Sequence, residues 1–254
     1  AECRFHQPIV PGDTLSTRSE VIGLKQNSNG RSGVVYVRST ATNQRGEVAR
    51  EWCRWVMVHK RDASAAAPET VLPELKPALA AADLVVPDGL DFSAYDFGAA
   101  GEPHRYDDYA VGECIDHVDG VTLGDSEHKM ATRLWQNTAK VHFNVEARSD
   151  GNCLIYGGHI ISMARALSFN GLANAQLVVG INAGSHVAPA FAGDTVYAWS
   201  EVLDKAELSD SVGALRLRLV ATKGRDESTT LRTDDGKYAA GVLLDLDYWA
   251  LIPR

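Results

Sequence analysis

An internal repeat restricts the fold of this 254-residue chain more than any other feature of its sequence. Residues 8–22 read PIVPGDTLSTRSEVI, and residues 189–203 read PAFAGDTVYAWSEVL. The Pro, Gly-Asp-Thr and Ser-Glu-Val positions coincide at a constant offset of 181 residues. After one deletion the match continues from residues 33–42 to residues 213–222. Self-similarity of this kind indicates two copies of one supersecondary unit.

Both copies predict antiparallel strands. Leu and Arg alternate over residues 215–219, and this two-residue period is typical of a strand. The Gly-Asp-Thr triplets lie where a turn should join two strands, since Gly and Asp tolerate tight-turn geometry. We therefore expect Asp13 and Asp194 to be turn residues rather than catalytic groups.

The segment between the two copies has a different composition. Residues 62–104 hold five of the nine prolines and many alanines. Such a stretch indicates an extended linker between domains. Residues 1–61 then carry only strands of a first repeat, and residues 105–254 form a complete second repeat.

The second repeat also contains a helix pattern. Apolar and small residues share one face from about His159 to Ala173, directly after Gly157-Gly158. One long helix wrapped by an antiparallel sheet is the hot-dog arrangement. We predict an α+β double hot-dog whose first repeat lacks its N-terminal helix part. Our hypothesis is that roughly 75–90 residues before Ala1 are truncated or disordered, because the repeats should match.

Bulk properties exclude several functions. The net charge of −8 argues against a general nucleic-acid binder. The apolar runs are shorter than the roughly 20 residues that cross a bilayer, so we expect no membrane span. The four cysteines are scattered without metal-ligand spacing, which predicts free thiols, no metal site and a cytoplasmic protein.

The densest polar cluster covers residues 122–159. It contains TLGDSEH (122–128), LWQNTAKVHF (134–143) and LIYGGHIIS (154–162). Hydration of an enoyl thioester needs a base for water, an acid for the α-carbon and donors for the enolate oxygen. A His beside an Asn or a carboxylate suits the water, and the N–H groups at a helix N-terminus suit the oxyanion.

These segments resemble the MaoC-like (R)-specific enoyl-CoA hydratases. RYDDYAVGE (105–113) is similar to their first strand, GDSEHKMATRLWQNTAKVH (124–142) to the helical approach to their Asp-x-Asn-Pro-x-His motif, and LIYGGH (154–159) to the His-Gly pair that opens their central helix. NQRGEV (43–48) and YGGHIISMARALSFNGL (156–172) resemble one subgroup, the bacterial mesaconyl-CoA hydratases. The resemblance implies reversible hydration of mesaconyl-CoA to β-methylmalyl-CoA, in acetate assimilation through the ethylmalonyl-CoA pathway. It also implies a hydro-lyase that needs no cofactor beyond the CoA of its substrate, and a homo-oligomer.

The resemblance assigns roles residue by residue. The catalytic His falls on His142, and the catalytic Asp of the motif falls on Asn137. The oxyanion glycine falls on Gly157 or Gly158. An amide can orient water but cannot accept a proton as a carboxylate does, so the acid–base work must shift to His142 or another group.

Structural explanations compete with these roles. His142 could be a structural histidine of a β-rich segment, Asn137 a helix C-cap, and the glycine pair only a turn. Four neighbours are further candidates for acid–base or supporting roles: Asp125, Glu127, His128 and His159. Asp125 and Glu127 also fit capping of a helix N-terminus. The other histidines are expected to be structural: His6, His59, His104, His117 and His186.

The charged parts of the substrate that the resemblance implies require cations for binding. Mesaconyl-CoA carries a free carboxylate, and Lys140, or else Arg165, is the candidate to bind it. Lys140 is equally consistent with a solvated lysine. Lys25 and Arg31, in the polar loop KQNSNGRSG (25–33), are candidates for the CoA phosphates.

The sequence is also consistent with three other functions. One is hydration of other acyl chains by an (R)-specific enoyl-CoA hydratase. Another is a hot-dog thioesterase, which needs a carboxylate near the start of the central helix. The third is a non-catalytic acyl-CoA binding protein, which the Asn at position 137 favours.

Overall fold

The computed structural model describes residues 2–225 and 229–254. These residues form two compact units. The first comprises Ala1–Asp91 with Leu177–Ala183, and the second comprises Phe92–Gln176 with Gly184–Arg254. The division at Asp91 falls inside the Pro- and Ala-rich segment expected to be a linker. The short stretch Leu177–Ala183 belongs to the first unit, although its sequence lies within the second repeat.

The first unit is an antiparallel sheet with the strand order β2-β3-β4-β1-β6. The strands are β1 (Cys3–Phe5), β2 (Ser16–Gln26), β3 (Ser32–Thr42), β4 (Val48–His59) and β6 (Leu177–His186), whose last residues belong to the second unit. Its described residues contain no α-helix, only the 3-10 turn η1 (Ala81–Asp83). Trp55 and Met57 on β4 remain 61% and 62% exposed, since no such helix covers them.

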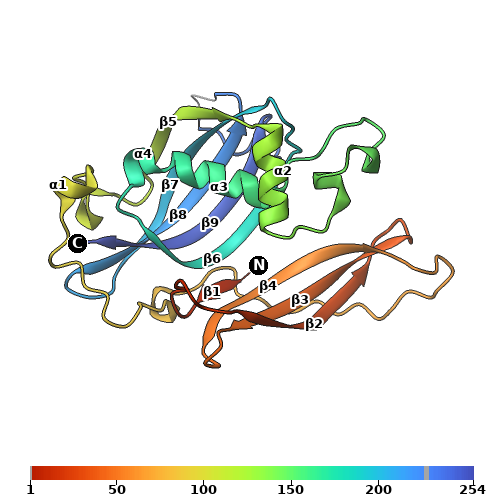
Figure 1. Cartoon of the computed structure of the whole chain (residues 1–254), viewed down its shortest axis with the longest axis horizontal. Helices are drawn as coiled ribbons and strands as arrows, with labels where there is room; N and C mark the ends of the chain where they lie inside the picture. Colours follow the sequence, from red (N-terminus) through yellow and green to blue (C-terminus); the bar gives the residue numbers. More distant parts are fainter. Residues whose placement is uncertain (1, 226–228) are drawn as a thin grey trace. The chain divides into compact units, whose positions relative to one another are not determined.

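The second unit is an antiparallel sheet of order β9-β8-β7-β5 with a helix across it. Its strands are β5 (Cys114–Thr122), β7 (Thr195–Glu207), β8 (Val212–Lys223) and β9 (Val242–Pro253). The helix α3 (Gly157–Leu167) contacts all four strands and lies across one face of this sheet (Figure 1). The remaining helical elements are α1 (Phe97–Ala100), η2 (Tyr106–Asp108), α2 (Asp125–Leu134), η3 (Lys140–His142), η4 (Val145–Ala147) and α4 (Phe169–Leu172).

The repeat predicted from the sequence is visible as matching turns and strands. Strands β2-β3-β4 and β7-β8-β9 are both consecutive antiparallel triplets. In the first turn the Val10 N–H donates to the Asp13 carboxylate at 3.1 Å, and in the second the Phe191 N–H donates to Asp194 at 2.9 Å. The glycine before each Asp has a positive φ, which glycine adopts without strain because it has no Cβ. The turn role predicted for Asp13 and Asp194 is confirmed.

Strand β8 shows why the second unit has the larger core. Its three leucines, Leu215, Leu217 and Leu219, are fully buried. Arg216 donates to the Asp247 carboxylate at 3.0 and 2.6 Å. A carboxylate on the neighbouring strand β9 thus neutralises the charge of this arginine. The alternation of Leu and Arg predicted for this strand is therefore present, although the side chains on both faces of β8 are largely buried.

The central helix is shorter than its sequence pattern predicted. It begins at Gly157, two residues earlier than expected, and ends at Leu167. The chain breaks at Asn170 and Gly171, where φ of Gly171 is 93°. The Asn170 carbonyl accepts from His117 Nδ1 at 2.7 Å, and the Gly171 carbonyl accepts from the Tyr109 hydroxyl at 2.7 Å. These bonds from distant residues satisfy carbonyls that would otherwise continue the helix.

The expectation that residues 105–113 form a first strand is wrong. This segment holds η2 and a turn, and β5 begins only at Cys114. The Glu113 carboxylate accepts from the Ala110 N–H at 2.9 Å, and Gly112 has φ 87°. The carboxylate and the glycine together favour a turn over an extended chain.

Candidate active site

A cavity of about 440 Å³ lies at the N-terminal end of α3 in the second unit. Its walls are mostly aliphatic, from Leu154, Ile155, Ile160, Val187 and Leu243. Gly157, His142 and His186 also line it. Among the described residues, these two histidines are the only titratable side chains that the cavity wall contains.

His142 ends the short η3 turn and is half-buried. Its Nδ1 lies 2.8 Å from the Leu154 carbonyl oxygen. A carbonyl only accepts, so Nδ1 must carry the proton and donate it. The lone pair of a neutral imidazole then lies on Nε2. His142 is thereby held in the tautomer that a general base on water requires.

The Gly157-Gly158 pair forms the first turn of α3. The N–H groups of a first helical turn have no acceptor within the helix, and the helix dipole makes this end positive. A Cβ on Gly157 would overlap the imidazole of His186, and a Cβ on Gly158 would overlap the hydroxyl of Tyr156. Side chains are thus excluded at the start of α3, and the Gly157 backbone can approach a ligand in the cavity.

His128 on α2 links the two helices from behind the site. It is fully buried, and its Nε2 accepts a hydrogen bond from the Tyr156 N–H at 2.9 Å. Its ring centroid lies 6.4 Å from that of His142 and 5.8 Å from that of His159. Burial, reinforced by the neighbouring His159 and His142, lowers the pKa of His128 to about 4. His128 is therefore neutral near pH 7 and keeps the lone pair that Tyr156 needs.

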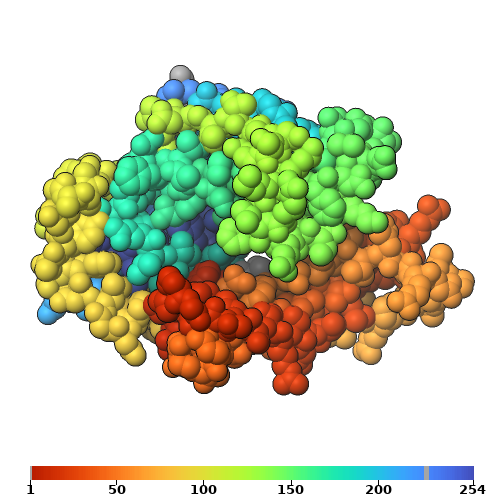
Figure 2. Space-filling model, viewed as in Figure 1, coloured from red at the N-terminus to blue at the C-terminus, as the bar shows by residue number. Residues whose placement is uncertain are grey.

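Glu127 and His159 form a second contact between α2 and α3. The Glu127 carboxylate accepts from the Gly124 N–H at 2.9 Å and lies 3.4 Å from His159 Nε2. The capping role predicted for Glu127 is confirmed by the bond to Gly124. Asp125 instead pairs with Lys129 at 2.8 Å, one turn along α2. Figure 2 shows α2 and the chain after it beside α3 on one face of the second unit.

Asn137 lies in the loop before η3 and not in the cavity wall. Its side-chain oxygen accepts from the Ala139 N–H at 3.0 Å, which is an Asx-turn. The alternative prediction of a helix C-cap is wrong, because α2 ends at Leu134 with Trp135 as its C-cap. The amide oxygen therefore shapes the turn that carries His142.

The cations expected to bind substrate are not in the cavity wall either. Lys140 is exposed on η3. Arg165 lies in the last turn of α3, where its guanidinium donates to the Ser168 hydroxyl at 2.6 Å and to the Ala175 carbonyl. Lys25 and Arg31 are exposed residues of the first unit, near the hairpin between β2 and β3.

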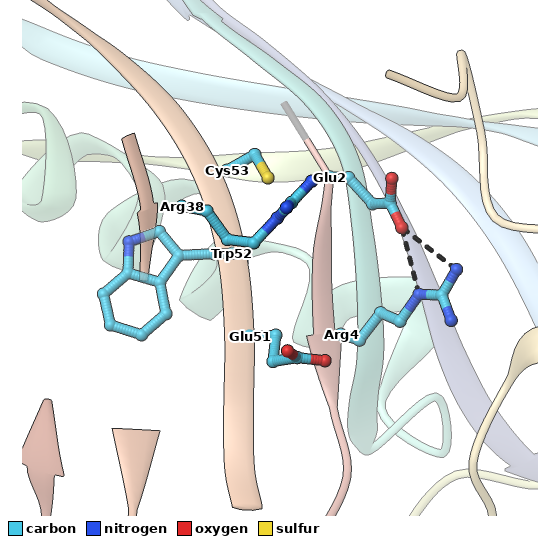
Figure 3. Close-up of a pocket in the computed structure, with 6 residues that line it drawn as sticks. All are labelled: Glu2, Arg4, Arg38, Glu51, Trp52 and Cys53. Carbon is cyan, nitrogen blue, oxygen red and sulfur yellow. Dashed lines mark hydrogen bonds and ion pairs between the residues drawn. The ribbon is translucent and has the colours of Figure 1, made fainter. Parts of the chain in front are cut away.

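A second pocket, in the first unit, is smaller, and charged side chains that line it form ion pairs (Figure 3). Its volume is about 100 Å³, which is too little for an acyl-CoA group. Arg4 is bound to Glu2 at 3.0 Å, and Glu51 meets His6 at 3.2 Å. This pocket is a structural feature of the sheet between β1, β3 and β4.

The cysteines, possible metal ligands and helix lengths bear on other functions. All four cysteines are free thiols. Within residues 2–225 and 229–254, no cluster of His, Cys, Asp or Glu side chains could hold a metal ion. No helix in this part of the chain is long and apolar enough to cross a membrane.

Comparison with known protein families shows the family to which this chain belongs. The model of the family described as mesaconyl-CoA hydratase matches residues 1–233. The chain belongs to the mesaconyl-CoA hydratase family. Its members include a protein of Cereibacter sphaeroides named mesaconyl-CoA hydratase, which is 65% identical over 255 residues and covers 100% of this chain and 74% of that protein. The family resemblance predicted from the sequence is confirmed.

Two relatives extend the family comparison to structure. A Chloroflexus aurantiacus protein named β-methylmalyl-CoA dehydratase is 53% identical over 257 residues, which cover 99% of this chain and 73% of that protein. A crystal structure from the same organism, described as a MaoC domain protein dehydratase, has a TM-score of 0.95 at 53% identity and covers 99% of this chain and 74% of that one. A Mycobacterium tuberculosis protein described as a double hot-dog has a TM-score of 0.72 over 99% of this chain and 73% of that one; at 24% identity it shows the fold alone. The double hot-dog prediction is confirmed.

The sequence predicts a structural role for His186, but the structure places this histidine in the same cavity wall as His142 and Gly157. Only one signal in the sequence could have indicated it: His186 ends the strand β6 and precedes the repeated Gly-Asp-Thr turn by a few residues. That signal does not show that the end of β6 lies beside the first turn of α3.

Proposed function

We propose that this chain catalyses the reversible addition of water to an enoyl-CoA thioester, converting mesaconyl-CoA to β-methylmalyl-CoA. One observation carries the proposal: His142 and the first turn of α3 line one cavity, in a chain 65% identical to a protein named mesaconyl-CoA hydratase. Acetate assimilation, as expected from the sequence, is the metabolic setting that goes with this reaction.

His142 is the base in this proposal. Its Nδ1–H is held by the Leu154 carbonyl, so Nε2 takes a proton from water as the water oxygen attacks the β-carbon. The bond to Leu154 also stabilises the imidazolium that forms, because a charged donor strengthens the same hydrogen bond. No change of tautomer is needed during the step.

The start of α3 is the oxyanion site. As the β-carbon gains the hydroxyl, negative charge moves to the thioester oxygen. Gly157 lines the cavity, and it stands at the N-terminal end of α3, which the helix dipole makes positive. Fixed donors of this kind stabilise the enolate more than the neutral thioester, which lowers the barrier.

The aliphatic walls suit a short acyl group rather than the polar part of CoA. Leu154, Ile160 and Leu243 contribute apolar side chains to the cavity wall. A wall of this composition offers an apolar surface to a bound acyl chain and few polar groups to the phosphates of CoA. The Glu127 carboxylate near α3 lies outside the wall, so a thioesterase would have no carboxylate in contact with the substrate.

A direct assay separates the proposed reaction from its alternatives. Purified protein is mixed with mesaconyl-CoA, and the enoyl-thioester absorbance and free thiol are followed together. We expect the absorbance to fall without thiol release, and β-methylmalyl-CoA to appear by mass spectrometry. Thiol release would identify a thioesterase, and unchanged substrate with retained binding would identify a binding protein; either result overturns the proposal.

Three accompanying expectations belong to this proposal. The reaction needs no cofactor beyond the CoA of its substrate, so dialysis against a chelator should leave the rate unchanged. The protein is a cytoplasmic homo-oligomer, which fractionation and sedimentation velocity test. Lys25 and Arg31 contact the CoA phosphates, so Arg31→Ala should raise KM for the CoA substrate more than for its pantetheine analogue.

A further inference from the structure

One requirement of the proposed reaction is not met by His142 and the helix terminus. The α-carbon must receive a proton in hydration and lose one in dehydration. The motif of the MaoC-like hydratases that this chain resembles has a carboxylate where this chain has Asn137, and an amide does not exchange protons in catalysis. Its oxygen is moreover occupied by the Ala139 N–H.

His186 lies where that second group is needed. It is the last residue of β6, and its side chain lines the cavity together with His142 and Gly157. The tip of its ring, Nε2, lies so close to Gly157 that no Cβ fits between them. The imidazole is thus beside the amide end of α3, where the thioester oxygen and the adjacent α-carbon must lie.

We propose that His186 is the second proton-transfer group of the site. This inference rests on the proposed hydration. His142 acts on the water or hydroxyl at the β-carbon, and His186 acts on the hydrogen at the α-carbon.

The step balances as follows in the hydration direction. His142 Nε2 removes one proton from water, and the oxygen forms a bond to the β-carbon. The electrons of the C=C bond move to the α-carbon and thioester oxygen, and the imidazolium of His186 gives its proton to the α-carbon. His142 ends protonated and His186 neutral, and solvent returns them to the starting state. Dehydration reverses each transfer and releases water.

The surroundings of His186 fit the dehydration direction especially well. Partial enclosure by protein atoms lowers the pKa of His186, although the residue as a whole is exposed. The only titratable group facing it in the cavity is His142, and the described wall contains no carboxylate, lysine or arginine. The neutral His186 of the free protein is therefore ready to take the α-proton of β-methylmalyl-CoA.

The test is His186→Gln, with His104→Gln as a matched control. His104 is an exposed histidine paired with Glu102 and lies outside the cavity wall. General acid–base catalysis contributes about 10²–10⁴-fold, so we expect kcat to fall by this factor in the His186 variant with KM nearly unchanged. The control should retain the wild-type rate, and both variants should melt within a few degrees of wild type.

The pH dependence distinguishes proton transfer from a structural role. A base must be neutral, so wild-type dehydration should be lost as pH falls through the pKa of His186. His186→Gln should remove this acidic limb. If the acidic limb persists in the variant, the inference is wrong.

A second substrate separates proton transfer from binding of the substrate carboxylate. Crotonyl-CoA has no free carboxylate, but its hydration needs the same α-proton. We expect His186→Gln to lower kcat on both substrates. A raised KM for mesaconyl-CoA alone would make His186 a carboxylate-binding residue and overturn the inference. Wild-type protein without hydratase activity would instead remove the proposed function itself.

Discussion

The hydrogen bond from the Tyr156 N–H to His128 offers a sharp test of how the site is held. His128→Leu removes the acceptor from a fully buried position while keeping an apolar side chain of moderate size. His128→Gln is the matched control, because its side-chain oxygen reaches about as far as Nε2 and can accept from the same amide.

The expected magnitude follows from burial. A buried amide without a partner costs about 1–3 kcal/mol of stability. We expect His128→Leu to lower the free energy of unfolding by that amount near pH 7.5, and His128→Gln to restore most of it. Because Tyr156 precedes Gly157, the Leu variant should also have a lower kcat than the Gln variant.

The same residue predicts a pH dependence of stability. The pKa of His128 is about 4 in the folded protein against 6.5 for an ordinary histidine. Between these values the unfolded chain binds a proton that the folded protein does not, so stability falls as pH decreases from about 6.5 toward about 4. A depression of this size is worth about 3 kcal/mol at most. Both His128 variants should show a flatter dependence than wild type.

Urea-induced unfolding at a series of pH values measures both effects. The variants are compared at constant ionic strength, with circular dichroism and tryptophan fluorescence as probes. The reasoning is refuted if the Leu and Gln variants unfold with equal free energies at pH 7.5, or if the wild-type and variant curves stay parallel between pH 6.5 and pH 4.

Further predictions concern the cavity and the sheet. Gly157→Ala should displace His186 and lower kcat/KM at least about tenfold, equivalent to about 1.4 kcal/mol, which steady-state kinetics would show. Lys140→Ala should change KM for mesaconyl-CoA less than about twofold, because this exposed lysine is not in the cavity wall and does not contribute to substrate binding. A larger increase in KM would show that Lys140 binds the substrate carboxylate, as the sequence predicted. Asp247→Asn should destabilise the protein by about 1–3 kcal/mol in chemical denaturation, because Arg216 loses a charged partner at 2.6 Å; an unchanged midpoint would contradict this.

The strands were predictable because their signals are local. The Gly-Asp-Thr turns and the alternation over residues 215–219 each depend on a few neighbouring residues, and both copies fold as expected. The end of α3 was not predictable in this way. Its break at Asn170 depends on His117 and Tyr109, which are more than fifty residues away in the sequence.

Only part of the candidate site was predictable from the sequence. The motif resemblance brought His142 and Gly157 together, and the structure places both in one cavity. It could not reveal that Asn137 serves an Asx-turn, since that depends on the loop geometry before η3. Nor could it reveal His186, whose place in the wall depends on the end of β6 lying beside α3.

The role of His142 as base is the central claim, and His142→Asn tests it most directly. The Asn amide can still donate to the Leu154 carbonyl, so the loop keeps its bond while the lone pair of Nε2 is lost. Single-turnover hydration of mesaconyl-CoA should slow by about 10²–10⁴-fold with substrate binding retained. A variant that hydrates mesaconyl-CoA at the wild-type rate would contradict the account.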